Sequence, residues 1–219
     1  MNKLIYSLFA STLALSVDVA HAASVAEVFT GDMLGTNQRY FESVAGIPRE
    51  SFGDEHKFKV QGCDITATIE GGTVSKLRME LTPKCQADLT QFVDTFAPAP
   101  GKPLTVGAFT ESSGGGLSYS ASCLSMCGNA ADPSVYAHWE GPRAIGFREV
   151  LLEVVLVSDA ALSAADQWES QMRKAEGEDY VMETRFNCDQ KYDAAAQKAF
   201  EKVQVSAVTI GTGLKASGC

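Results

Sequence analysis

The clearest pattern of hydrophobic and polar positions covers residues 58–81. Apolar residues occupy every second position of residues 63–70 and again of residues 76–81. A period of two is typical of β-strands that have one buried and one solvated face. Gly71-Gly72, between the two runs, favours a tight turn. Together with a short strand at residues 58–60, these segments predict an antiparallel β-meander.

The second half of the chain contains a similar pattern. Apolar residues alternate with polar ones over residues 117–123 and again over residues 135–139. Residues 150–157 are almost continuously apolar, which is typical of a central strand that is covered on both sides. A further strand is expected around residues 180–186. The second half therefore also predicts strands arranged as a meander.

Helices are predicted where apolar residues recur three and four positions apart and a capping residue precedes them. The predicted helices, each with its expected capping residue, are a short helix through Val44 (Thr36 or Asn37), a helix through Phe96 (Asp88), a helix through Ala175 (Ser163, with Asp166 as the capping-box partner) and a helix through Val203 (Asp189). Gly46 and Pro48 are expected to end the first of them. Residues 112–116, which contain two serines and three glycines, predict a loop.

Strands and helices in this arrangement predict an α+β fold, in which antiparallel β-meanders carry helices packed on one face. Three prolines between Ala97 and Pro103 form a stiff connector. The globular part is therefore expected to be a single α+β domain over residues 23–219, or two lobes covering residues 23–97 and 104–219.

The first 22 residues resemble an export signal. Lys3 is followed by a mostly apolar stretch from Leu4 to Val17, and Ala20-His21-Ala22 has the small residues that a signal peptidase recognises. The apolar stretch is too short for a permanent membrane anchor. We expect cleavage after Ala22 and a periplasmic or secreted protein. The next residue is Ala23, not cysteine, so no lipid attachment is expected.

The cysteines are therefore expected to form disulfide bonds, because an even number of cysteines in an exported chain is typical of disulfide pairing. The six cysteines are Cys63, Cys85, Cys123, Cys127, Cys188 and Cys219. Pairing of nearest neighbours along the chain is the simplest arrangement. A metal or redox site formed by Cys123 and Cys127 with His56 and His138 is the alternative, although an oxidising compartment favours disulfides.

The formal net charge of −9 limits the range of partners. An acidic chain repels phosphate backbones and anionic membrane surfaces, so neither nucleic acid nor membrane is an expected partner. No apolar run after the signal approaches the roughly 20 residues that a membrane span needs. The expected partner is another protein, whose surface is basic or mixed in charge.

Sequence motifs for catalysis are absent from the chain. There is no Gly-x-Ser-x-Gly elbow, no His-Glu-x-x-His helix and no phosphate-binding loop. We therefore expect no catalytic residue, cofactor or metal. Asp64 and Glu70 place two carboxylates on one strand, which is interpreted as its solvated side. Tyr136 and His138, two positions apart on one strand face, are the nominated contact residues.

Residues 35–70 resemble one known pattern of envelope and secreted proteins. It consists of Gly35, a short helix, Gly46-Ile47-Pro48 and strands that open with Phe58 and Val60. Proteins of the SmpA/OmlA outer-membrane assembly type and the secreted β-lactamase inhibitor protein family have a similar helix, Gly-x-Pro and strands. The first family is lipid-anchored, and this chain lacks the cysteine for it. The resemblance implies a protein that binds proteins, with no particular contact residue carried over.

These observations favour an exported, non-enzymatic protein that binds another protein, as an inhibitor, an immunity-type neutraliser or an envelope assembly factor. Two alternatives stay open. One is a periplasmic carrier of a small ligand, with an apolar pocket between sheet and helices. The other is a hydrolase whose site the sequence does not reveal.

Overall fold

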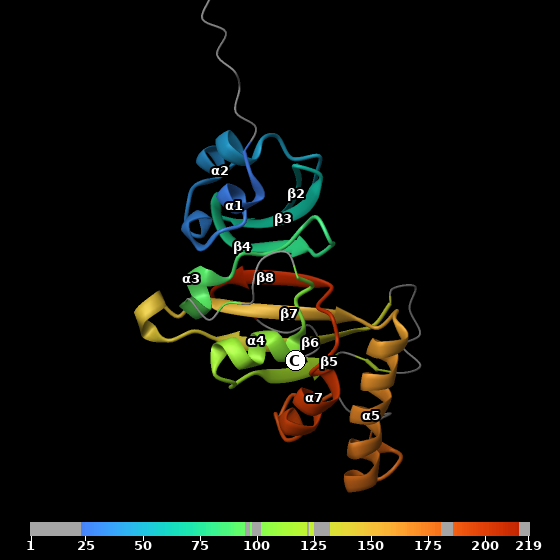
Figure 1. The fold of residues 1–219 in the computed structure, drawn as a ribbon. Coiled ribbons are helices and arrows are strands. Elements are labelled where there is room, and N and C mark those ends of the chain that lie inside the picture. Colours follow the sequence, from blue (N-terminus) through green and yellow to red (C-terminus); the bar gives the residue numbers. More distant parts are fainter. Residues whose placement is uncertain are drawn as a thin grey trace, which may run out of the picture.

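The computed structural model describes residues 23–94, 97, 102–121, 123–124, 132–180 and 186–214. Its centre is one eight-stranded sheet in the order β1-β2-β3-β4-β8-β7-β6-β5, and every neighbouring pair is antiparallel (Figure 1). The predicted α+β class, with antiparallel meanders, helices and a disulfide bond, is confirmed.

The sheet is built from two meanders and one late strand. The first meander comprises β1 (Glu50–Phe52), β2 (Glu55–Val60), β3 (Cys63–Glu70) and β4 (Thr73–Glu80). The second comprises β5 (Ser118–Ala121), β6 (Ser134–Glu140) and β7 (Glu149–Val155). The late strand, β8 (Ala207–Gly211), pairs with β4 on one side and β7 on the other. Because β8 lies between the meanders, a single sheet runs through both halves of the chain.

Two of these strands were not expected from the sequence. β1 is only three residues long, and β8 is five. Both strands are too short for a reliable alternation pattern, and β8 is instead specified by pairing along both of its edges.

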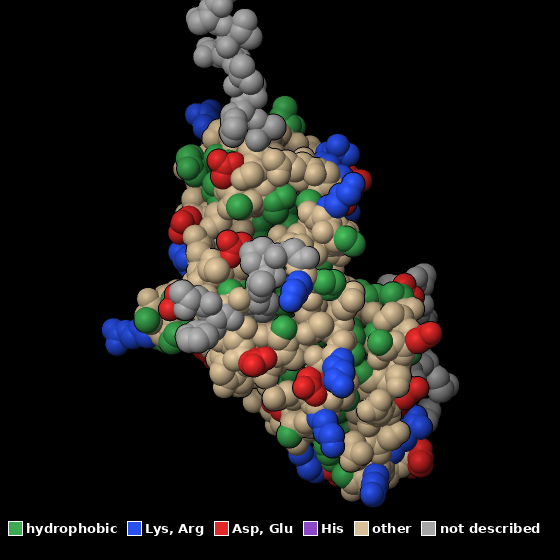
Figure 2. Space-filling model, viewed as in Figure 1, with side chains coloured by type: hydrophobic (Ala, Val, Ile, Leu, Met, Phe, Trp, Pro, Cys, Tyr) green, Lys and Arg blue, Asp and Glu red, His purple; other side chains and the backbone are tan. Residues whose placement is uncertain are grey.

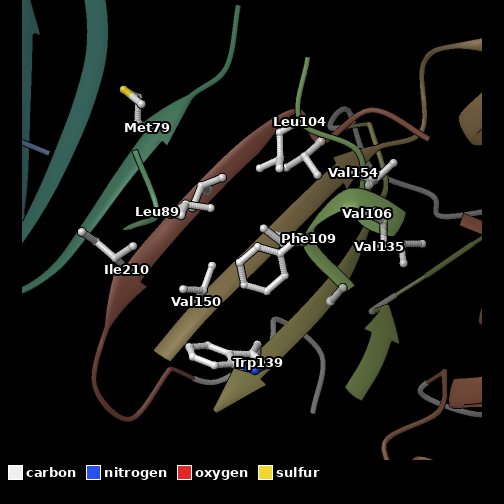
Figure 3. Close-up of a cluster of buried hydrophobic side chains, with 14 of the residues drawn as sticks. Met79, Leu89, Leu104, Val106, Phe109, Val135, Trp139, Val150, Val154 and Ile210 are labelled. Carbon is white, nitrogen blue, oxygen red and sulfur yellow. The ribbon is translucent and has the colours of Figure 1, made fainter. Parts of the chain in front are cut away.

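The helices pack on one face of the sheet. They are α1 (Val25–Val28), α2 (Gln38–Ala45), α3 (Thr90–Val93), α4 (Val106–Ser113), α5 (Asp159–Glu176) and α7 (Asp193–Phe200), with short 3-10 turns at Gly31–Met33 and Arg143–Ile145. Figure 3 shows Phe109 of α4 directed toward Val150 and Trp139 on the covered face of the sheet. The rings of Phe109 and Trp139 meet edge to face, with centroids 5.9 Å apart.

The first predicted helix is confirmed by α2. The Asn37 side chain accepts a hydrogen bond from the Tyr40 backbone N–H at 2.9 Å, and Gly46 ends the helix. The Phe41 ring then packs edge to face on Phe58 of β2, with centroids 5.1 Å apart. This contact attaches the helix to the first meander.

Three other helix predictions need correction. α5 begins at Asp159 and is capped by Ser158, whose hydroxyl accepts from the Ala161 N–H, so Ser163 lies inside the helix. α7 begins at Asp193, and Asp189 accepts instead from the Lys191 N–H in the preceding turn. A single Ser or Asp can cap a helix at several positions in the sequence, and tertiary packing determines at which of them the helix begins.

The other corrections concern α3 and α4. α3 is a single turn, and the predicted continuation to Phe96 lies outside the described residues. α4 was not predicted at all, because Ser112 and Ser113 were interpreted as loop. They form the last turn of α4, which Gly114 ends in a left-handed conformation with φ 76°.

The first nearest-neighbour disulfide is confirmed, since Cys63 and Cys85 are bonded. Cys123 is part of a disulfide bond, and so is Cys188. Cys127, Cys219 and the first 22 residues lie outside the described part of the chain, so the other two pairings and the signal peptide stay predictions. Within the described ranges, no helix has both the length and the apolar character to cross a membrane.

Candidate functional site

One face of the sheet points away from the helices, and its residues follow from the strand register. Directly opposed residues on neighbouring strands point to the same face. One row crosses all eight strands through Glu50, Lys57, Thr66, Arg78, Thr209, Leu151, His138 and Ser118. A second row contains Phe52, Glu55, Thr68, Lys76, Gly211, Glu149 and Glu140, and a third contains Lys59, Asp64, Glu80, Ala207, Glu153, Tyr136 and Ser120. We call the residues of these three rows the open face.

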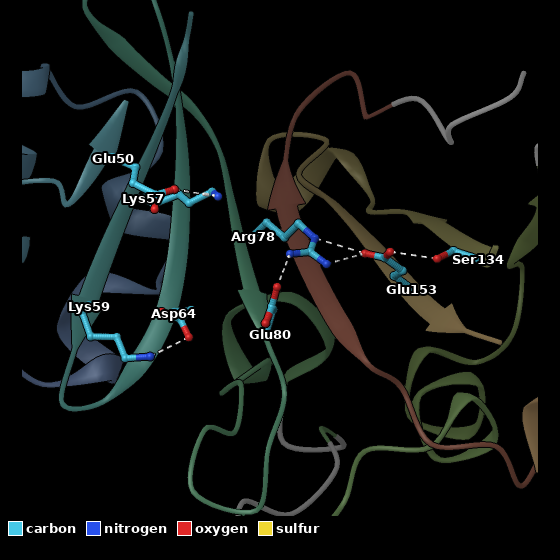
Figure 4. A network of polar contacts seen from close by, with 8 residues as sticks. All are labelled: Glu50, Lys57, Lys59, Asp64, Arg78, Glu80, Ser134 and Glu153. Carbon is cyan, nitrogen blue, oxygen red and sulfur yellow. Dashed lines mark hydrogen bonds and ion pairs between the residues drawn. The ribbon is translucent and has the colours of Figure 1, made fainter. Parts of the chain in front are cut away.

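The open face is hollowed along its middle. The hollow has a volume of about 820 Å³, and its lining comes from β1 to β4 and from β6 to β8. Five carboxylates and three cationic side chains line it: Glu50, Glu55, Asp64, Glu80 and Glu153, with Lys57, Lys76 and Arg78. Figure 4 shows how several of them point into the space between the first meander (β1–β4) and the second (β5–β7). The hollow is therefore polar and mixed in charge, with a small excess of carboxylates.

Arg78 lies at the centre of this network. Its Nη2 and Nε donate to the same Glu153 oxygen at 2.8 and 3.0 Å, and its Nη1 lies 3.3 Å from a Glu80 oxygen (Figure 4). The other Glu153 oxygen accepts from the Ser134 hydroxyl at 3.0 Å. Because Arg78 is on β4 and Glu153 on β7, the pair bridges the two meanders across β8.

The protonation of Arg78 follows from this geometry. Partial burial acts to lower the pKa of Arg78, but the Glu153 and Glu80 carboxylates outweigh it and raise the pKa above its ordinary value. The guanidinium is therefore charged under all physiological conditions.

Two ion pairs that solvent can reach lie toward the edge of the same face. Lys57 Nζ is 2.9 Å from Glu50, and Lys59 Nζ is 2.6 Å from Asp64. The hydrogen bond from Lys57 to Glu50 raises the pKa of the lysine. These pairs link adjacent strands and contribute little to stability, because Glu50, Lys57 and Asp64 are exposed and Lys59 is only partly buried. In each pair, the lysine charge is balanced by the neighbouring carboxylate.

Of the residues nominated from the sequence, some line the hollow and others do not. Tyr136 and His138 share the open face, and Tyr136 lines the hollow. His138 does not line the hollow, and its Nε2 lies 2.8 Å from an oxygen of the buried Glu149. Asp64 lines the hollow, whereas Glu70 follows a register shift after Thr68 and is outside the lining. Whether Tyr136 and His138 contact a partner stays a prediction.

Phe52 is an exposed aromatic residue at one end of the open face. It lies in β1 immediately before the turn to β2, opposite Glu55, and 89% of its surface is exposed. A phenylalanine gains stability from burial, so full exposure on a strand is unfavourable for solubility unless something covers it.

Phe147 is a second exposed aromatic residue, in the long turn between β6 and β7. It is 53% exposed, and its φ of 55° lies in the left-handed region that bulky side chains avoid. The turn is held by hydrogen bonds from the Ile145, Gly146 and Phe147 amides to the Pro142 and Arg143 carbonyls. In Figure 2, hydrophobic and cationic side chains mark the tip of this turn, which projects to the left.

Both phenylalanines lie at the same end of the strands, one beside the β1–β2 turn and one in the β6–β7 turn. The row that holds Phe52 also holds Glu140 and Glu149, which flank the β6–β7 turn. The hollow lies on the strands between them. Neither residue was predicted as a contact residue, because a phenylalanine next to a glycine in a turn cannot be told from a core residue by sequence alone.

The open face combines a rigid frame, a mixed-charge hollow and the exposed side chain of Phe52, and Phe147 lies beyond it in the β6–β7 turn. Among the described residues, no group of three or more His, Cys, Asp or Glu side chains is arranged to hold a metal. Comparison of the chain with protein-family models, with curated proteins and with solved structures found no match.

Proposed function

We propose that this chain is an exported binding protein that holds another protein against its open face. The observation that supports this most is the placement of Phe52 and Phe147, two exposed aromatic residues at the same end of the strands that carry the charged hollow. Aromatic anchors of this kind contribute a large part of the free energy of protein–protein binding. The hydrogen-bonded turn around Phe147 also lowers the entropy that ordering would cost on binding.

The partner in this proposal has a basic or mixed-charge surface. The chain carries a net charge of −9, and carboxylates outnumber cations in the hollow. Complementary charge increases the rate of association and selects among partners more than it raises affinity. The resemblance of residues 35–70 to envelope assembly proteins and to the β-lactamase inhibitor protein points to the same class. Inhibitor, immunity-type neutraliser and assembly factor are the forms that this function could take.

A small-ligand carrier is the second candidate, because a volume of about 820 Å³ falls within the range of ligand pockets. Such pockets are mostly apolar, with a few polar groups. The hollow here is lined largely by charged side chains that already pair with one another, so a protein surface fits it better.

The proposal is tested by capture from an envelope extract on the immobilised mature chain, with mass spectrometry of the retained proteins. The variant Phe52→Ser/Phe147→Ser should lose the retained partner. Ile47→Ser is the matched control, because Ile47 is 90% exposed but precedes β1, away from the hairpin turn.

Retention by the wild type and by Ile47→Ser, with loss in the double variant, is the expected result. Equal retention by all three chains would place the contact elsewhere. Turnover of a small substrate by the pure protein would reject the proposed class of function.

A further inference from the structure

The segment that follows β8 turns back over the open face. Gly213 has a φ of 64°, which permits the reversal. Leu214 is only 6% exposed but does not belong to the core under the helices. A Cβ placed on Gly211 would lie 2.9 Å from the Leu214 side chain. Because Gly211 opposes Lys76 and Glu149, that Cβ points to the open face, so Leu214 lies over this face.

The buried carboxylate of Glu149 holds this segment. One Glu149 oxygen accepts from the Gly213 N–H at 2.6 Å, and the other accepts from the Leu214 N–H at 2.7 Å. The second oxygen is also 2.8 Å from His138 Nε2. Charged acceptors form stronger hydrogen bonds than neutral ones, and these are shielded from water. The shared oxygen places the Leu214 backbone beside the imidazole.

The position of this segment determines where the hollow ends. Leu151 lines the hollow, whereas His138, its direct neighbour on β6, does not. Residues 212–214, His138 and Glu149 close this end. Because Gly211 has no side chain, it leaves the room that Leu214 fills.

We propose that residues 212–214 form a strap that covers one end of the open face and lowers its affinity for the partner until the strap is released. Release would add His138 and the surface over Gly211 to the contact area. This inference rests on the proposed function, but the state of the strap can be measured without any partner.

The test compares Glu149→Gln with Glu140→Gln in the full mature chain. Glu140 opposes Glu149 on the same face and is exposed, which makes it a matched control. The amides of Gly213 and Leu214 should exchange with deuterium at least about tenfold faster in Glu149→Gln, because their charged acceptor is lost. The control should match the wild type.

A second variant separates the strap from the Glu149–His138 contact. Leu214→Asn keeps Glu149 intact but removes the apolar side chain that covers Gly211. His138 should become more reactive toward diethyl pyrocarbonate in this variant, and the protein captured by the wild type should bind more tightly.

Each arm can overturn the proposal separately. Unchanged exchange in Glu149→Gln would mean that the carboxylate does not hold the strap. Unchanged His138 reactivity in Leu214→Asn would mean that the strap does not cover the histidine. Weaker partner binding by Leu214→Asn would make Leu214 part of the contact surface and reject an inhibitory role. Absence of any captured partner would count against the proposed function, while the first two readouts would still decide whether the strap exists.

Discussion

At Phe147, a bulky side chain sits on a left-handed backbone and remains half-exposed. That conformation costs a non-glycine residue about 1–2 kcal/mol. We expect Phe147→Gly to be as stable as the wild type or up to about 1 kcal/mol more stable, because relief of strain offsets the added entropy of the unfolded chain. Urea unfolding measures this change. The same variant should bind the partner at least about tenfold more weakly.

A loss of more than about 1 kcal/mol in Phe147→Gly would contradict this account of the residue, because it would show that the ring stabilises the fold. Unchanged binding would remove Phe147 from the contact surface.

Substitution of Glu153 tests the ion pair between Arg78 and Glu153. Its carboxylate accepts from Arg78 and Ser134, and both Glu153 and Arg78 are partly buried. Glu153→Gln should lower the free energy of unfolding by about 1–3 kcal/mol, because a half-buried guanidinium loses its main partner. Glu50→Gln, which breaks the exposed pair with Lys57, should cost less than about 0.5 kcal/mol. Equal effects in the two variants would show that the bridge across β8 adds no stability.

At the scale of elements, strands with a clean alternation were predictable and short ones were not. β3 buries Cys63, Ile65, Ala67 and Ile69 on one face, as the period of two indicates. β8 has only five residues and acquires its place through β4 and β7, which are far away in the sequence. α4 was missed because serines and glycines near its end favour loops locally, whereas Phe109 and Val106 bind it to the core.

The Cys63–Cys85 disulfide joins the start of β3 to the segment after β4. The two cysteines are 22 residues apart, and a loop of this length predicts a contribution of roughly 3 kcal/mol in the chain-entropy model. Cys63→Ala/Cys85→Ala should lower the free energy of unfolding by about that amount, measured in urea. A change below about 1 kcal/mol would mean that packing alone holds this segment.

At the scale of the whole molecule, the two predicted meanders become one sheet because β8 lies between them. The polar sides of β3 and β4 were predictable from alternation, and so was the shared face of Tyr136 and His138. The hollow was not, because it depends on strand order and on the curvature of the whole sheet. The role of Glu149 was also hidden, since its partners Gly213 and Leu214 are more than 60 residues away.

The acidity of the whole chain predicts that binding depends on salt. The association rate with the captured partner should fall clearly between about 50 and 500 mM salt, whereas the dissociation rate should change little. Stopped-flow or surface-based kinetics measure both rates. An association rate that does not respond to salt would show that the net charge of −9 serves solubility alone.

The most direct test of the central claim is a footprint of the bound partner on this chain. Side-chain oxidation by hydroxyl radicals, read by mass spectrometry, compares the free chain with its complex. The proposed function predicts protection of Phe52, Tyr136 and Phe147, with no change at Leu162, an exposed residue of α5. Protection of Leu162 and the helices, with the three aromatic residues unchanged, would contradict binding through the open face.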